Sequence, residues 1–160
     1  MSENTRIKCF ATPETEDLLN LLSGHLSIHD GIKSDVQPCA NARKNGDMNE
    51  CLDGGSTFLT AIMDSSESRE SGLRTLAQCP SRVPTIVLFD QEGYNLWEKQ
   101  PVGHVGLAVL TGSRAGEFKS LEGLLSIGAK FFRVTSDTPW PVQLSQVVAE
   151  DIVEFVRVAS

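Results

Sequence analysis

Three short apolar segments recur at a regular interval in the second half of the chain. They are VPTIVLF at 83–89, GLAVLT at 106–111 and AKFFRVT at 129–135, and they begin about 23 residues apart. Parallel neighbours in a sheet need a dozen or more residues of connection, usually with a helix, to return to the same edge. The interval therefore predicts an α/β fold in which crossovers wrap a parallel sheet.

The chain opens with a predicted strand and helix. The segment RIKCFAT at 6–12 is typical of a short buried strand, and Pro13 then opens a run with leucines at helical spacing. Acidic residues occupy the first turn of that run, where the helix dipole favours them, and Gly24 lies near its end. A weaker strand candidate, IKSDV, follows at 32–36.

Two further regions are less well defined by their pattern. From 38 to 55 the chain is rich in Gly, Asn, Asp and Lys, which predicts a flexible loop. At 57–63 the apolar residues fit either a strand that ends at Asp64 or a helix, because so short a run does not fix its period. We expect one α/β domain over residues 1–160, a three-layer sandwich with a mostly parallel five-stranded sheet.

Composition and charge exclude several classes of protein. Of the 160 residues, 40% are hydrophobic and 22% are charged, which is typical of a globular protein large enough to bury a core. The formal net charge of -7 argues against nucleic acid or an anionic membrane as the partner, since both attract basic surfaces. The polar start MSENTRIK lacks the apolar core of a secretion signal, so a cytoplasmic location is expected.

The four cysteines predict neither a zinc site nor a disulfide framework. They lie too far apart for a CxxC pair and have no cluster of histidines near them, so no metal or other cofactor is expected. We expect four reduced thiols, with Cys9 buried in the first strand.

The end of the chain resembles a known family. Within the segment 107–148, Thr111 follows an apolar strand, and a Gly-Ala pair at 128–129 precedes aromatic residues at 131–132. These residues match the hydroxyl after the fourth strand, and the Gly-Ala-aromatic signal of the fifth strand, in the receiver domains of response regulators. The opening segment 6–22 also resembles the first strand and helix of that family. The resemblance covers less than half of the chain and implies a receiver- or flavodoxin-like sheet, with Thr111 as its switch-like residue.

Receiver chemistry needs residues that this chain lacks. The family holds magnesium through an acidic pair after its first strand, phosphorylates an aspartate after its third strand and pairs that aspartate with a lysine after its fifth. Here Ala11-Thr12 stands in place of the acids, and the stretch 133–135 holds no lysine. Asp64 and Asp90 are the two candidate phosphoacceptors. The resemblance implies a pseudo-receiver, a non-enzymatic signalling module without a cofactor that binds a protein partner or self-associates.

A second resemblance is to von Willebrand A domains. The run GGST at 54–57 and the later Asp90 resemble the second and third loops of that family, which holds a divalent ion through a threonine and an aspartate. The DxSxS loop of the family precedes that threonine, whereas here the pattern occurs only at 64–68, after Thr57. The resemblance implies an adhesion or assembly domain with a degenerate metal site.

A third interpretation is a small enzyme or an anion-binding protein. The carboxyl ends of the strands would bring Asp90, residues 111–114 and residues 136–137 to one crevice. The run TGSRAG at 111–116 would offer backbone amides and an arginine to an anion. No spacing of serine, cysteine and histidine is typical of a nucleophile and its base, so no catalytic residue is predicted.

Two surfaces are candidates for contact with a partner. Tyr94 and Trp97 lie between two predicted strands, and aromatic residues are enriched in interfaces. The final helix, expected over 141–157, carries a wide apolar face that includes Ile152 and Phe155. Such a face is either core or interface, because something must cover it.

Overall fold

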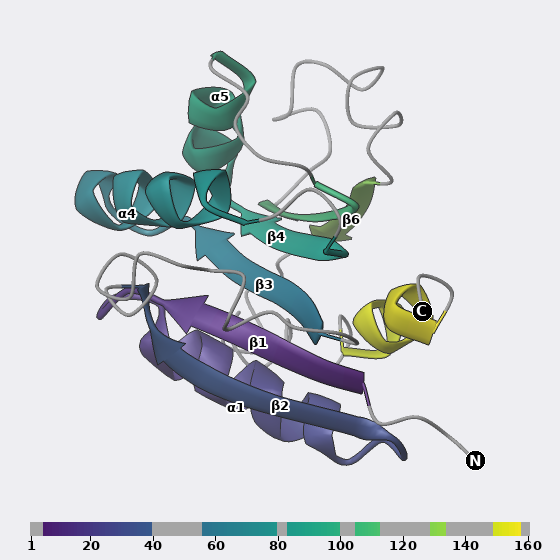
Figure 1. Ribbon diagram of the computed structural model, residues 1–160. Coiled ribbons are helices and arrows are strands. Elements are labelled where there is room, and N and C mark those ends of the chain that lie inside the picture. Colours follow the sequence, from purple (N-terminus) through teal and green to yellow (C-terminus); the bar gives the residue numbers. More distant parts are fainter. Residues whose placement is uncertain are drawn as a thin grey trace.

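A parallel sheet of six strands forms the centre of the computed structural model (Figure 1). The structure describes residues 5–39, 56–79, 83–99, 105–112, 129–133 and 149–157. The strands are β1 Thr5–Ala11, β2 Ile32–Pro38, β3 Ser56–Ile62, β4 Thr85–Phe89, β5 Leu107–Gly112 and β6 Ala129–Arg133. The helices are α1 Glu16–Ser27, α4 Ser66–Ala77 and α5 Gln91–Lys99, and residues 149–157 are helical as well.

The strands lie in the order β2-β1-β3-β4-β5-β6, and every neighbouring pair is parallel. The predicted α/β class and parallel sheet are thus confirmed. From β1 the chain crosses to β2 on one side, and then returns to place β3 on the other side of β1. The carboxyl ends of β1 and β3 therefore flank the point where the strand order reverses, which is the usual place for a ligand in an open α/β sheet.

The sheet has one strand more than expected because the ambiguous segment near 57–63 is a strand. β3 pairs with β1 on one side and with β4 on the other, and all seven of its residues are buried. A strand covered on both faces carries apolar residues without alternation. Its sequence therefore lacks the period-two pattern that would have separated it from a helix.

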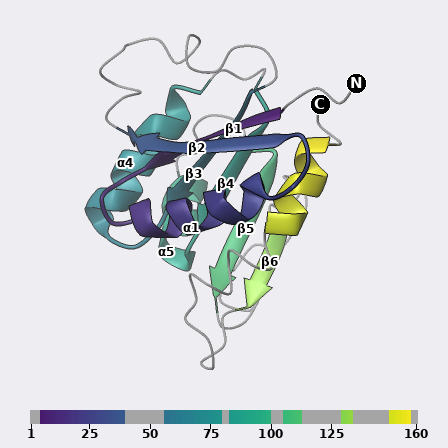
Figure 2. The ribbon, with the colours of Figure 1, turned by 90° about the horizontal axis from the view of Figure 1, so that it is seen from below.

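Helices cover both faces of the sheet, as the three-layer prediction requires (Figures 1 and 2). Side chains alternate between the two faces along each strand. Those on one face pack with α1 and with helical residues 149–157, and include Ile7, Cys9 and Leu59. Those on the other face pack with α4 and α5, and include Phe10 and Phe58. Two separate apolar clusters thus join the three layers.

The boundaries differ from the expected ones at several places. β2 runs to Pro38, two residues beyond the predicted end of that strand, and the side chain of Cys39 after it is buried. The predicted loop at 38–55 therefore begins later, and residues 40–55 lie outside the described part of the chain. Of the helix predicted over 141–157, residues 149–157 are described and are helical.

Candidate functional site

Three short segments meet where β1, β3 and β4 end. Residues 12–15 lead from β1 into α1, residues 63–65 lead from β3 into α4, and Asp90 leads from β4 into α5. Because the strands are parallel, all three segments lie at one edge of the sheet, called the carboxyl edge below. Each segment is also the start of a helix, so unpaired backbone N–H groups gather there.

A cluster of three buried hydroxyl groups lies at the carboxyl edge. The Oγ1 atom of Thr12 lies 3.0 Å from Oγ1 of Thr15 and 2.6 Å from Oγ of Ser68, a residue of α4. The backbone N–H of Thr12 also donates to Oγ1 of Thr15, at 3.0 Å. The cluster is neutral and satisfies its own hydrogen bonds. It begins at Thr12, where the receiver resemblance would require an acidic residue.

The carboxylate of Asp90 is fully engaged by its neighbours. It accepts hydrogen bonds from Nε of Arg69 at 3.1 Å and from Nη2 of Arg69 at 2.6 Å. It also accepts the backbone N–H of Gly93 at 2.7 Å and that of Asp64 at 3.1 Å. The bond to Gly93 makes Asp90 the N-cap of α5. Asp90 therefore joins the ends of β3 and β4 to the start of α5.

Arg69 is the cation of this arrangement. Its Nη1 atom forms a second ion pair, 2.9 Å from Oε2 of Glu92, and only 12% of its side chain is exposed. The hydrogen bonding of the Arg69 guanidinium to the carboxylate of Asp90, which outweighs the opposing effect of burial, raises the pKa of Arg69 above its ordinary value. Arg69 thus stays charged and is committed to two carboxylates.

Asp64 has an unusual backbone conformation. Its φ angle is 88°, the only positive φ among the described residues other than glycine. The conformation is held because its N–H donates to Asp90 and its carbonyl accepts from Nη2 of Arg69 at 3.3 Å. Asp64 is exposed, and its carboxylate forms no ion pair with any residue that the structure describes.

Two glycines allow α4 and α5 to lie directly on β3. A Cβ atom at Gly93 would lie 1.8 Å from the carbonyl oxygen of Ile62, and one at Gly72 would lie 2.7 Å from that of Ala61. Both obstructing atoms belong to the backbone, so no side-chain rotation relieves the clash. The close approach holds the middle of α4 and the first turn of α5 against the carboxyl end of β3.

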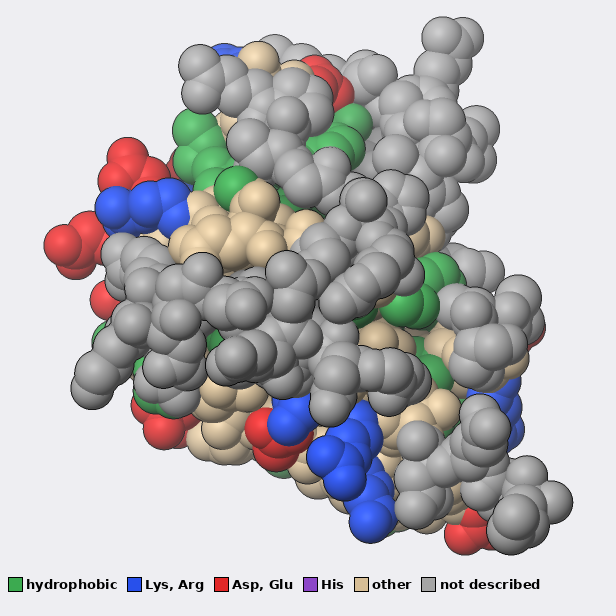
Figure 3. Space-filling view, viewed as in Figure 1, with side chains coloured by type: hydrophobic (Ala, Val, Ile, Leu, Met, Phe, Trp, Pro, Cys, Tyr) green, Lys and Arg blue, Asp and Glu red, His purple; other side chains and the backbone are tan. Residues whose placement is uncertain are grey.

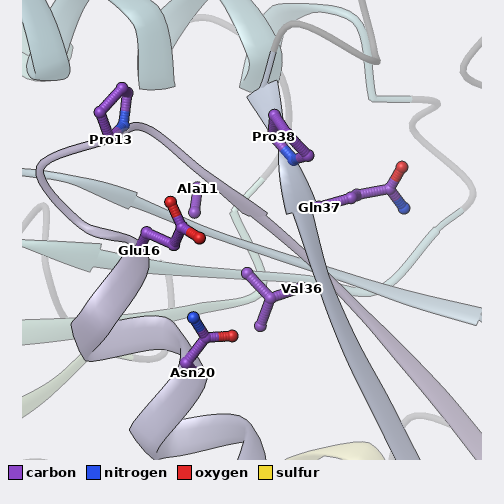
Figure 4. Close-up of a pocket in the computed structure, with 7 residues that line it drawn as sticks. All are labelled: Ala11, Pro13, Glu16, Asn20, Val36, Gln37 and Pro38. Carbon is purple, nitrogen blue, oxygen red and sulfur yellow. The ribbon is translucent and has the colours of Figure 1, made fainter.

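Two hollows flank the start of α1. The β2 hollow, of about 180 Å³, is lined by Ala11, Pro13, Glu16, Asn20, Val36, Gln37 and Pro38. Figure 4 shows Glu16 and Asn20 extending from α1 toward Val36 across this hollow. The β3 hollow, of about 200 Å³, is lined by Glu14, Thr15, Asp17, Leu18, Leu21, Met63 and Asp64. The β3 hollow lies at the reversal of strand order, between α1 and the end of β3.

The structure places the two candidate phosphoacceptors together, but Thr111 lies in a different strand from the one that the receiver resemblance implies. Asp64 follows the third strand and Asp90 the fourth, and a hydrogen bond links them. Thr111 lies within β5, the fifth strand, where its register partner is Phe132 of β6. The match of Thr111 to a hydroxyl after the fourth strand is therefore wrong by one strand. Its side chain lies outside the described part of the structure.

The structure separates Thr57 from Asp90, which the von Willebrand A resemblance would bring together at a degenerate metal site. Thr57 is buried near the amino end of β3, whereas Asp90 follows the carboxyl end of β4. Because Phe58 is level with Thr85 in the parallel register, the two side chains are roughly 20 Å apart along the strands. One ion does not bridge such a distance. Among the described residues, no group of three His, Cys, Asp or Glu side chains is arranged to hold a metal.

Two of the four candidate contact residues belong to the core. Tyr94 is 2% exposed and packs edge-on against Phe89, and Ile152 is fully buried. The prediction that these two side chains form a contact surface is wrong, because the faces of the sheet need them as cover. Trp97 and Phe155 are half-buried against the same two apolar clusters.

The crevice proposed for an enzyme is described only in part. Asp90 lies at the carboxyl edge as predicted, while residues 113–114 and 136–137 lie outside the described ranges. The sequence interpretation missed Arg69 and the hydroxyl cluster. Arg69 gives no local signal, because its partner is 21 residues away in sequence. The spacing of Thr12 and Thr15 before a helix was an available hint for the cluster.

Comparison with known proteins adds no family. No protein-family model matches the chain, and no curated protein sequence matches it. No helix in the described ranges has the length and apolar character that a membrane crossing requires. Inference about function therefore depends on the geometry of the carboxyl edge.

Proposed function

We propose that the protein is a non-enzymatic regulatory module of the pseudo-receiver type, which acts by binding a protein partner. The observation that carries this proposal is the neutral cluster of Thr12, Thr15 and Ser68 at the carboxyl edge. A receiver holds its magnesium ion there through carboxylates, and hydroxyl groups bonded to one another do not replace that charge. The cluster suits a site that connects helices more than one that transfers a phosphoryl group.

The arrangement of the strands supports a receiver-like fold. The order β2-β1-β3-β4-β5 is that of doubly wound, flavodoxin-like sheets, and β6 extends it at one edge. Fold alone is compatible with many functions, so the chemistry of the carboxyl edge must decide between them.

Among the residues that the structure describes, no uncommitted cation pairs with either candidate phosphoacceptor. Asp90 is saturated by Arg69 and by two backbone N–H groups. Asp64 has an exposed carboxylate, but the nearby Arg69 already pairs with Asp90 and Glu92. Phosphoryl transfer relies on cations that neutralise the developing charge. Regulation through a binding surface therefore explains this edge better than phosphorylation does.

A cytoplasmic location fits the same proposal. Cys9 and Cys39 are free thiols and are buried in the described part of the chain, as in a protein that works in a reducing compartment. Burial, with a smaller effect of the charge on Asp35, raises the pKa of the Cys9 thiol well above its ordinary value, so this thiol is unreactive.

Calorimetric titration with magnesium, alone and then with beryllofluoride, tests the proposal. We expect no binding heat in either titration, because the acidic pair that would hold the ion is missing. Magnesium binding that depends on beryllofluoride and disappears in Asp64→Asn would contradict the proposal and indicate an active receiver. Glu70→Gln, which removes an exposed carboxylate from α4, is the control for a general effect of charge.

A further inference from the structure

We propose that the β3 hollow binds an arginine or lysine side chain of the partner protein. That the occupant belongs to a protein rests on the function proposed above. That it is a cation with an apolar stem rests on the hollow itself. The β3 hollow lies at the reversal of strand order, the position where open α/β sheets bind ligands.

The floor of the β3 hollow is apolar. Leu18 and Met63 are 5% and 2% exposed, and Leu21, the next apolar residue along this face of α1, is 37% exposed. The volume of about 200 Å³ is below the 300–1,000 Å³ of typical small-molecule pockets. Such a space suits a single long side chain better than a metabolite. The aliphatic stem of arginine or lysine would cover the exposed part of Leu21.

The rim of the β3 hollow is acidic. Glu14, Asp17 and Asp64 are exposed, and none of them forms an ion pair with a described residue. Asp17, Leu18 and Leu21 follow helical spacing and share one face of α1, and Glu14, in the turn before the helix, lines the same hollow. A cation whose stem lies on the leucines would therefore reach the carboxylates with its head.

Charge on the surrounding surface favours the same occupant. Figure 3 shows several acidic side chains around one basic group at the left margin, where the strands end, while most side chains coloured as charged over β1 and β2 are basic. Arg69, a cation that the structure describes at this edge, is committed to Asp90 and Glu92. An approaching basic segment would thus meet attractive charge at the carboxyl edge, whereas an acidic one would be repelled.

The β2 hollow provides a matched control on the other side of α1. Glu16 lies in the same helical turn as Asp17, is exposed as well and lines the β2 hollow (Figure 4). Glu16→Gln therefore removes the same charge from the same turn without touching the β3 hollow. If substitution of Asp17 weakens binding of the cation and Glu16→Gln does not, the binding site is the β3 hollow. A general attraction to an acidic protein would be weakened by both substitutions.

The test uses the full chain and a blocked peptide, Gly-Gly-Arg-Gly-Gly, followed by the NMR signal of the Met63 methyl group. We expect a saturable shift of this signal with the arginine peptide, and none with the same peptide carrying the neutral analogue citrulline. Glu14→Gln combined with Asp17→Asn should raise the Kd about tenfold at low salt. Glu16→Gln should leave the Kd at the wild-type value.

Three results would overturn the inference. They are an unmoved Met63 signal, equal shifts with arginine and citrulline peptides, and a loss of affinity in Glu16→Gln as large as in the double variant. If free arginine amide binds as tightly as the peptide, the inference that the occupant belongs to a protein is wrong, and the ligand is a small cation. The beryllofluoride titration is read independently, because it reports on Asp64 and magnesium. A positive result there would contradict the pseudo-receiver proposal without changing the outcome of the peptide test.

Discussion

At the scale of single residues, the side chain of Asp90 constrains the backbone of Asp64. Asp90 caps α5, pairs with Arg69 and accepts the N–H of Asp64, which lies 26 residues earlier in the chain. The left-handed conformation of Asp64 costs on the order of 1–3 kcal/mol, so the contacts from Asp90 and Arg69 must outweigh it. The result is an aspartate held out from the end of β3 with its carboxylate exposed beside the β3 hollow.

The burial of Tyr94 leads to a prediction that isolates one residue, because the chain contains a single tyrosine. Burial, with a hydrogen bond to Glu98 and the charge of Glu98, raises the pKa of Tyr94 to about 12. Tyrosinate absorbance should therefore titrate near pH 12 in the folded protein, and near the ordinary value of 10 in urea. Since the folded pKa is the higher one, this group's contribution to stability is complete below pH 10 and is lost as pH rises toward 12. Titration of the folded protein near pH 10 would contradict the buried position and restore Tyr94 as a surface residue.

At the scale of helices and strands, the packing of α5 depends on Gly93. The helix runs for nine residues after β4. The position of α5 on the sheet was not predictable, because nothing in the sequence near Gly93 shows that the carbonyl of Ile62 will lie against that glycine. The predicted α1 was easier, since its leucine spacing and acidic first turn are local signals, and the structure confirms it.

Replacement of two glycines tests this packing, with one serving as the control for the other. Gly93→Ala should destabilise the protein by about 3 kcal/mol or more, because its Cβ would clash with the backbone of β3. Gly24→Ala in α1, where nothing lies within 4 Å of the new Cβ, should stabilise it by about 0.5–1 kcal/mol. Urea unfolding measures both changes. Equal effects of the two substitutions would mean that α5 does not approach β3 as closely as described.

At the scale of the whole molecule, the sheet order decides which residues meet, and the sequence does not contain that order in readable form. The lengths of the connections indicated parallel strands, but not that β3 returns past β1 to its other side. The von Willebrand A resemblance matched Thr57 and Asp90 to neighbouring loops, whereas Thr57 lies near the amino end of β3 and Asp90 follows the carboxyl end of β4. Because the sheet order was not readable, the contact between Thr12 and Ser68, 56 residues apart in sequence, was not foreseen.

The contact between Thr12 and Ser68 joins the two parts of the chain on either side of the strand-order reversal, so it should couple their stabilities. Thr12→Val and Ser68→Ala should each destabilise the protein by about 1–2 kcal/mol, because each removes the buried hydrogen bond between the β1–α1 connection and α4. The double variant should be destabilised by about 1 kcal/mol less than the sum of the two single variants, since the second substitution removes a hydroxyl that has already lost this hydrogen bond.

Ser34→Ala provides the control, because Ser34 forms hydrogen bonds with Ser23 and Ser27 between α1 and β2. Its effect on the free energy of unfolding should add to that of Thr12→Val. Urea unfolding of the full set measures the coupling. Additive effects for Thr12 and Ser68 would mean that the hydroxyl cluster does not hold α4 to the β1–α1 connection, and the neutral cluster would then no longer explain the carboxyl edge.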